Sequence, residues 1–162
     1  MALNAYLKLK GQKSGEIKGS VIQKGRENQI LIVGADHLIV SPRDAASGLP
    51  TGKRQHQPIV LTKEVDRATP VLHTVLTNNE NITEFRLDFW QAANTGAEVQ
   101  YFTIELVNAS IASIKLEMLN NEYPENVKIP VREKIAFTYQ KIIWTWRQDG
   151  VTSTDDWEAQ AV

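Results

Sequence analysis

Three histidines are the residues of this sequence best suited to proton transfer or metal binding: His37, His56 and His73. No two of them are four positions apart, as ligands on one helical face would be, and no HExxH motif occurs. Asp36 precedes His37, and such a pair could supply a general base. Adjacent residues of a regular strand point to opposite faces, so we expect Asp36 not to orient His37 and assign His37 a structural role. His56 lies in a basic, polar segment, where we expect contact or solvation rather than catalysis.

The cysteine, serine, glycine-rich and carboxylate patterns that mark catalytic or ligand-binding sites are also missing from the sequence. The sequence has no cysteine, which excludes thiolate nucleophiles, disulfides and Cys-based zinc sites. No serine lies in a Gly-x-Ser-x-Gly elbow, and neither a P-loop nor a GxGxxG motif occurs. Glu84 and Asp88 share one strand face with Arg86 between them, which favours cross-strand ion pairing over a pair of catalytic carboxylates. We therefore predict no catalytic residue, cofactor or metal site, and no enzymatic activity.

The length indicates one globular domain, residues 1–162, and the net charge indicates no strong electrostatic attraction to charged partners. A chain of this size buries a core of its own. The formal net charge of −1 gives no overall attraction to nucleic acid or to an acidic membrane. The N-terminus lacks the pattern of a signal peptide, and no apolar run approaches the roughly 20 residues that span a membrane. We expect a cytoplasmic protein that, if exported, leaves without a cleaved signal.

Alternation of apolar and polar residues predicts a mainly β protein, because half-buried strands have a period of two. The strands are expected at 2–9, 30–40, 59–63, 84–90, 99–107, 110–118 and 135–146. Asn94-Thr95-Gly96 is a turn signal that joins the fourth and fifth of these into a hairpin. Such antiparallel strands around one core indicate a two-sheet β-barrel or β-sandwich.

One short α-helix is expected at about 70–78. Thr69 is a natural N-cap and Pro70 suits the first helical position. Asn78 and Asn79 tolerate the left-handed conformation with which helices often end. The helix is therefore about two or three turns long.

Two segments do not follow the strand pattern. Residues 41–58 contain three prolines and two glycines without periodicity, which indicates a long loop of the kind that is usually functional or disordered. This loop is basic but has no aromatic residue, unlike the surfaces with which small β-barrels bind single-stranded nucleic acid. The tail, 150–162, is polar and expected to be flexible unless Trp157 docks.

Several segments, in chain order, resemble the haemolysin-coregulated protein (Hcp) family of bacterial type VI secretion. They are Ala5-Tyr6-Leu7-Lys8-Leu9, Gly15-Glu16-Ile17-Lys18-Gly19-Ser20, the loop 41–56 with its Arg54-x-His56 ending, Phe85-Arg86-Leu87-Asp88-Phe89-Trp90, and Ala136-Phe137-Thr138-Tyr139-Gln140-Lys141-Ile142 with Trp144-x-Trp146. Each motif is moderately specific, and the ordered set covers nearly the whole chain.

The resemblance implies a two-sheet β-barrel with a flanking helix that forms homohexameric rings, which stack into a tube. A contractile sheath expels such a tube with a spike protein at its tip, and small effector proteins ride in the lumen. The protein would wait in the bacterial cytoplasm and then be secreted or delivered into a target cell. An alternative within the resemblance is a free ring that acts as a chaperone or carrier of effectors.

The long loop is the candidate contact between subunits or between rings, because its polar surface suits an interface that forms and later separates. The candidate contact residues are Arg43, Asp44, Leu49, Lys53, Arg54 and His56.

Overall fold

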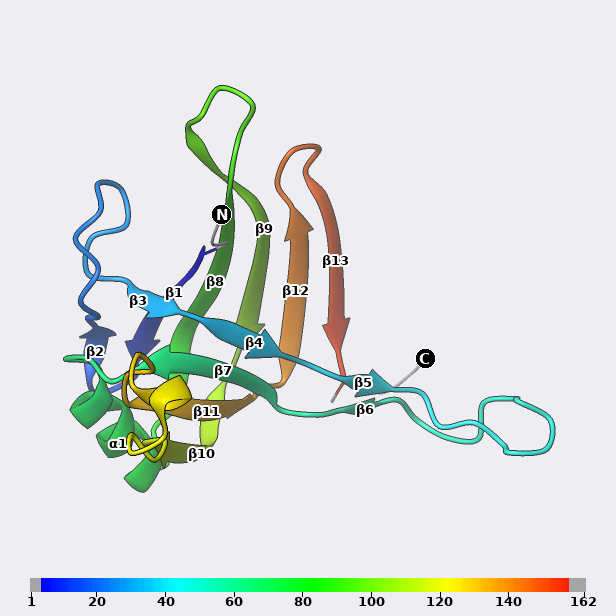
Figure 1. Ribbon diagram of the computed structural model, residues 1–162. Helices are drawn as coiled ribbons and strands as arrows, with labels where there is room; N and C mark the ends of the chain where they lie inside the picture. Colours follow the sequence, from blue (N-terminus) through cyan, green and yellow to red (C-terminus); the bar gives the residue numbers. More distant parts are fainter. Residues whose placement is uncertain (1–3, 158–162) are drawn as a thin grey trace.

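The computed structural model describes residues 4–157, in which two antiparallel β-sheets pack against each other (Figure 1). The larger sheet has the order β13-β12-β9-β8-β1-β2, and β3 also pairs with β1. Its strands are β1 (Asn4–Gly11), β2 (Gly15–Ile17), β3 (Ile30–Ile32), β8 (Ile82–Ala92), β9 (Glu98–Val107), β12 (Lys141–Trp146) and β13 (Val151–Asp156).

The smaller sheet has the order β10-β11-β7-β4. Its strands are β4 (Gly34–Asp36), β7 (Ile59–Glu64), β10 (Ser110–Glu117) and β11 (Arg132–Thr138). A separate ribbon pairs β5 (Ile39–Val40) with β6 (Gln55–His56), and a 3-10 turn, η1 (Pro124–Asn126), lies between β10 and β11. The predicted mainly β, two-sheet fold is confirmed as a sandwich; the sheets do not close into a barrel.

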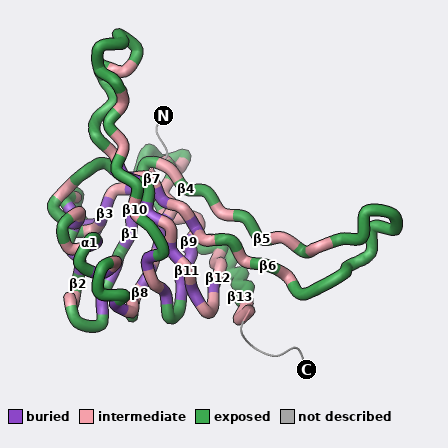
Figure 2. Tube along the Cα trace, turned by 90° about the horizontal axis from the view of Figure 1, so that it is seen from below, coloured by how far each residue is buried: buried purple, intermediate pink, exposed green. Residues whose placement is uncertain are grey.

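The core lies between the two sheets, where alternating apolar residues of each sheet meet. Phe85 of β8 and Phe137 of β11 come from opposite sheets, and their ring centroids are 5.0 Å apart. Buried residues follow the strands, whereas the connecting segments are mostly exposed (Figure 2). The predicted hairpin is confirmed as β8 and β9, with Gly96 in the left-handed conformation that the turn requires.

The expected helix is confirmed as α1 (Thr69–Thr77), with Leu72 and Val75 in the core. Its N-cap is Ala68, so the prediction of Thr69 as cap is wrong. The Thr69 hydroxyl instead donates to Glu133 Oε1 at 2.8 Å and accepts a hydrogen bond from Lys63. At the other end, Asn79 has a φ of 47°, as expected for a helix terminator.

Two strands that the sequence predicts as continuous are each divided between sheets. The run 30–40 becomes β3 in the larger sheet, β4 in the smaller sheet and β5 in the ribbon. The run 135–146 breaks at Tyr139 and Gln140, so that β11 and β12 belong to different sheets. At the second break the buried positions change phase, from Phe137 and Tyr139 before it to Ile142 after it.

The alternation along 110–118 predicts that Ala112, Ile114, Leu116 and Met118 share one strand face. The register of β10 against β11 shifts between Ile111 and Ser113, so Ile111 is buried, while Leu116 is 61% exposed. In the tail, Val151–Asp156 forms β13 and pairs with β12, and Trp157 packs against the core, which is the condition under which the tail was expected to be ordered. Residues 158–162 of the expected tail lie outside the described part of the chain.

Candidate functional site

Residues 38–57 form an arm that extends beyond β13, away from β2 (Figures 1 and 2). At its root, β5 pairs with β6, and the Gln57 N–H donates to the Leu38 carbonyl at 3.0 Å. Further out, Arg43 and Pro50 form an isolated bridge. The expected structureless loop is therefore a two-stranded excursion of the backbone.

The turn at the tip is held by Asp44. Its carboxylate accepts hydrogen bonds from the Ser47 hydroxyl at 2.6 Å and from the Ser47 N–H at 3.1 Å. These bonds lower the pKa of Asp44 below its usual value. Gly48 follows with a φ of 72°, a conformation that favours glycine. The tip thus has a defined backbone although it lies in solvent.

The six predicted contact residues fall into two groups. Arg43, Asp44, Leu49 and Lys53 are exposed on the outer arm, where another molecule can reach them. Arg54 and His56 lie at the root and contact the same chain. The prediction that these two residues make contacts between subunits remains untested, and their observed partner is the C-terminal strand.

Asp155 of β13 binds both root residues. Arg54 donates through Nε and Nη2 to the two carboxylate oxygens, at 2.6 and 2.7 Å, in the bidentate geometry of strong ion pairs. His56 Nε2 lies 2.7 Å from Asp155 Oδ2. The hydrogen bonds from Arg54, followed by those from His56, outweigh burial and lower the pKa of Asp155. The arm is therefore anchored to the edge strand of the larger sheet.

The His56 ring continues this network inward. A carboxylate only accepts hydrogen bonds, so His56 Nε2 is the donor to Asp155. The other ring nitrogen, Nδ1, lies 2.6 Å from the Tyr139 hydroxyl. The same hydroxyl oxygen lies 2.9 Å from His37 Nε2, which can donate to it. The Trp157 ring stacks on His56 at 5.6 Å, and its Nε1 donates to the Tyr139 carbonyl at 2.6 Å.

The series Asp155, His56 and Tyr139 has the order of a carboxylate, a base and a hydroxyl, as in nucleophilic catalysis. Here, however, the hydroxyl is occupied by both histidines, and Tyr139 is only 5% exposed. Burial, and the charge of Asp155 after it, raises the pKa of Tyr139 well above the ordinary value, which keeps the hydroxyl protonated. The arrangement is suited to holding the arm rather than to attacking a substrate.

The sequence interpretations of the remaining polar residues can be compared with the structure. Asp36 does not contact His37 by a hydrogen bond in the described residues, and the partner of His37 is Tyr139. The predicted cross-strand pairing holds for Glu84, which lies 3.8 Å from Lys8 of β1, whereas Asp88 pairs with Arg86 of its own strand at 3.1 Å. Sequence reasoning missed Tyr139 and Asp155, whose role depends on contacts across about a hundred residues; the conditional docking of Trp157 was the one available signal.

Neither metal binding nor membrane spanning has support within residues 4–157. No group of three or more His, Asp or Glu side chains there could hold a metal ion. No helix in the same part of the chain is long and apolar enough to cross a membrane.

Comparison with known proteins identifies consistent relatives. The family model described as "Type VI secretion system effector, Hcp" matches residues 6–146. The "Major exported protein" of Pseudomonas aeruginosa is 36% identical over 168 residues, covering 98% of this chain and 98% of that protein.

Solved structures agree with this family. A crystal structure described as Hcp protein has a TM-score of 0.90 and 27% identity, and the match covers 98% of this chain and 100% of that one. A variant of the Hcp1 protein of E. coli EAEC 042 has a TM-score of 0.85 and 29% identity, with 96% and 99% of the two chains covered. The secreted protein Hcp3 of Pseudomonas aeruginosa has a TM-score of 0.80 and 29% identity, with 98% and 100% covered.

Proposed function

The chain belongs to the Hcp family of type VI secretion proteins, and from this membership we propose that it is the subunit of an expelled tube made of stacked hexameric rings. Hcp proteins are secreted structural proteins of this machine and not enzymes. This agrees with the sequence-based prediction that the chain has no enzymatic activity. The Asp155–His56–Tyr139 network accordingly has a structural role.

The observation that carries the proposal is the anchored arm. It extends past the sandwich, and its outer residues Arg43, Leu49 and Lys53 are exposed. A two-stranded excursion of this kind is marginal in water unless something covers it. Its root is nevertheless held by the bidentate pair of Arg54 with Asp155. An arm that is positioned but uncovered suits contact with a further subunit.

The open sandwich gives a second reason for self-assembly. β13 is at the edge of the larger sheet, and Val151 to Thr154 are exposed along it. Unpaired edge strands are liable to pair with other chains, and proteins usually cover them. A heterologous ring covers such edges, because one side of each subunit meets a different side of the next and the rotation closes.

We further propose where in the cell the subunit acts and which proteins it contacts. The subunit would wait in the bacterial cytoplasm, assemble below a spike protein inside a sheath, and be expelled with small effector proteins in its lumen. Secretion itself follows from the family and from the exported relative. If the protein works instead as a free carrier ring, an effector should co-purify with it and be stabilised by it.

Native mass in solution tests the proposed ring. Size exclusion with light scattering should give a mass near six times 18.2 kDa, with ring-shaped particles in negative stain. A monomer over the whole accessible concentration range would contradict ring formation.

A further inference from the structure

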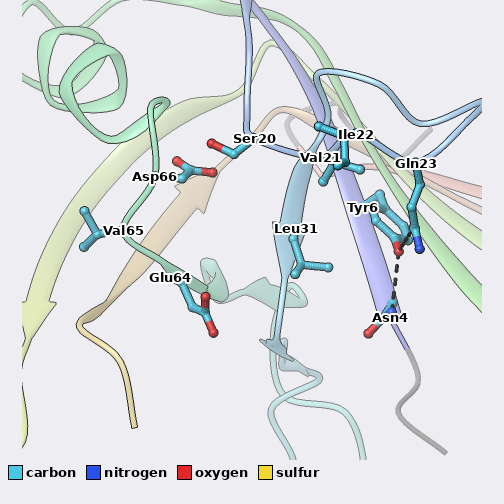
Figure 3. Close-up of a pocket in the computed structure, with 10 residues that line it drawn as sticks. All are labelled: Asn4, Tyr6, Ser20, Val21, Ile22, Gln23, Leu31, Glu64, Val65 and Asp66. Atoms are coloured by element: carbon cyan, nitrogen blue, oxygen red, sulfur yellow. Dashed lines mark hydrogen bonds between the residues drawn. The ribbon is translucent and has the colours of Figure 1, made fainter. Parts of the chain in front are cut away.

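A groove lies at the other side of the molecule from the arm. It is bounded by β1, β3, the segment after β2 and the segment between β7 and α1, and has a volume of about 440 Å³. Figure 3 shows residues 64–66 along one wall and Tyr6, Ile22 and Leu31 along the other. This size is within the range of pockets that bind ligands or peptide side chains. The part of the groove that could receive an arm consists of Val21, Ile22, Leu31, Glu64, Val65 and Asp66.

The groove is apolar inside and acidic at its rim. Ile22 is 90% exposed and Val65 is 45% exposed, although both are large apolar residues. Within the described residues, Glu64 makes no ion pair through its side chain, whereas Asp66 pairs with Lys63 at 2.9 Å. The surface thus offers uncovered apolar area beside an available carboxylate.

The arm tip has the complementary character. Leu49 is 64% exposed at the turn, and two cations, Arg43 and Lys53, flank it in the sequence. Neither cation forms a side-chain ion pair within residues 4–157. An apolar side chain between two free cations matches an apolar groove beside free acidic charge, and such complementarity sets orientation and specificity at interfaces.

The positions of the two surfaces determine how copies can associate. The arm extends beyond β13, and the groove lies near β2 and β3 at the opposite edge of the larger sheet (Figures 1 and 2). An arm cannot reach the groove of its own chain from there. Contact between two different surfaces of identical chains either continues from copy to copy, as in a heterologous ring, or closes in a dimer whose two copies exchange arms.

We propose that the arm tip, residues 42–53, of one copy seats in this groove of a second copy. Leu49 enters between the apolar walls, and Arg43 and Lys53 lie beside Glu64 and Asp66. The inference rests on the proposed self-assembly and adds to it the receiving surface.

Cysteine cross-linking tests the contact directly, since the chain has no cysteine of its own. Leu49→Cys protein is mixed with Val65→Cys protein and, separately, with Ile22→Cys protein, and each mixture is oxidised mildly. A covalent dimer is expected in both mixtures. Each variant oxidised alone controls for contacts between two tips or two grooves. Leu49→Cys mixed with Leu116→Cys is the matched control, because Leu116 is 61% exposed but lies on β10.

Light scattering on the same samples separates this inference from the proposed ring. Oligomers of ring mass without a cross-link at either groove position would overturn the inference and leave the ring standing. A cross-link specific to the groove, in protein that never exceeds a dimer, would support the inference and contradict the hexamer. Monomers without any cross-link would overturn both.

Discussion

Lys63 and Glu133 form a buried ion pair between neighbouring strands, with Nζ and Oε1 2.5 Å apart. The two residues are paired in the register of β7 and β11, and both side chains are 0% exposed. Lys63 Nζ also donates to Thr69 Oγ1 and to the Glu64 carbonyl, and it pairs with Asp66. The pair therefore connects the smaller sheet to the start of α1.

Removing one partner should be costly, because it leaves the other charge buried without compensation. We expect Lys63→Met to lower the free energy of unfolding by about 3–5 kcal/mol. Urea denaturation measures this change. The double variant Lys63→Met/Glu133→Leu should lose clearly less than the single variant, since the fully buried carboxylate of Glu133 is removed together with its cation.

A surface ion pair provides the control. Lys8 and Glu84 are 3.8 Å apart and about half exposed, so Lys8→Met should cost no more than about 1 kcal/mol. A Lys63→Met variant as stable as Lys8→Met would contradict the structural role of the buried pair.

The root of the arm should make stability depend on pH. Burial and the neighbouring His56 lower the pKa of His37 below its ordinary value of 6.5, while the Gln57 backbone and Asp36 act weakly in the opposite direction. Unfolded His37 then binds a proton at a higher pH than folded His37. The contribution of His37 to stability is complete above pH 6.5 and is lost as the pH falls from there toward the folded pKa.

His37→Gln should reduce this dependence. Urea unfolding at about pH 7.5 and pH 5.5 should show a smaller loss of stability in the variant than in the parent protein. His73→Gln, at an exposed position of α1, controls for the loss of one histidine. Asp155 does not contribute to the change between these two pH values. Its pKa is lowered in the folded protein, so its contribution to stability is lost only as the pH falls below about 3.8. Equal losses in parent and His37→Gln protein would exclude His37 as the sensitive group.

The sequence predicts local structure well, such as a hairpin or a single helix. The β8–β9 hairpin follows from alternation on both sides of Asn94-Thr95-Gly96, and α1 follows from Pro70 at its start and from Asn78 and Asn79 at its end. The sequence does not predict the change of sheet after Ile32 and at Tyr139, because the alternation of an extended chain does not identify the strands beside it. Strand pairing is a long-range property, and these corrections concern which strand lies beside which.

The candidate site shows the same limit. The sequence predicts order in the polar segment 151–156 only if Trp157 docks, and it does not predict that this segment pairs with β12 and presents Asp155 to Arg54. Arg54 and Asp155 are 101 residues apart, so nothing in the composition of either segment indicates the contact. Trp157 was the only apolar aromatic residue in the tail, and burying it is the hydrophobic gain that the sequence could indicate.

Gly19 should be sensitive to any side chain, because the backbone of another segment passes close to it. A Cβ there would lie 2.3 Å from the Gln29 carbonyl oxygen and 2.7 Å from Ile30 Cα. Backbone atoms cannot rotate away as a flexible side chain would. We expect Gly19→Ala to lower the free energy of unfolding by about 1–3 kcal/mol.

Gly52 is the matched control for this substitution. No heavy atom lies within 4 Å of a Cβ at this position on the arm, and its φ is outside the left-handed range. Gly52→Ala should therefore change stability by no more than about 0.5 kcal/mol. Equal thermal stability of the two variants would mean that the segment around Gly19 can relax.

Deleting Gly48 to Gly52 should separate folding from assembly. These residues contribute no side chain to the core, and the Leu49 carbonyl and the Thr51 N–H bond only to Asp44 and Pro42 of the same arm. The anchor between Arg54 and Asp155 lies outside the deletion. The variant should therefore keep its circular dichroism spectrum and its thermal midpoint within a few degrees, but stack into tubes less readily than the parent protein. Sedimentation and negative-stain microscopy at matched concentrations measure the stacking.

An unfolded variant would contradict the assignment of this segment to assembly, because it would mean that the tip stabilises the subunit. Normal tubes from a folded variant would place the stacking contacts elsewhere on the ring.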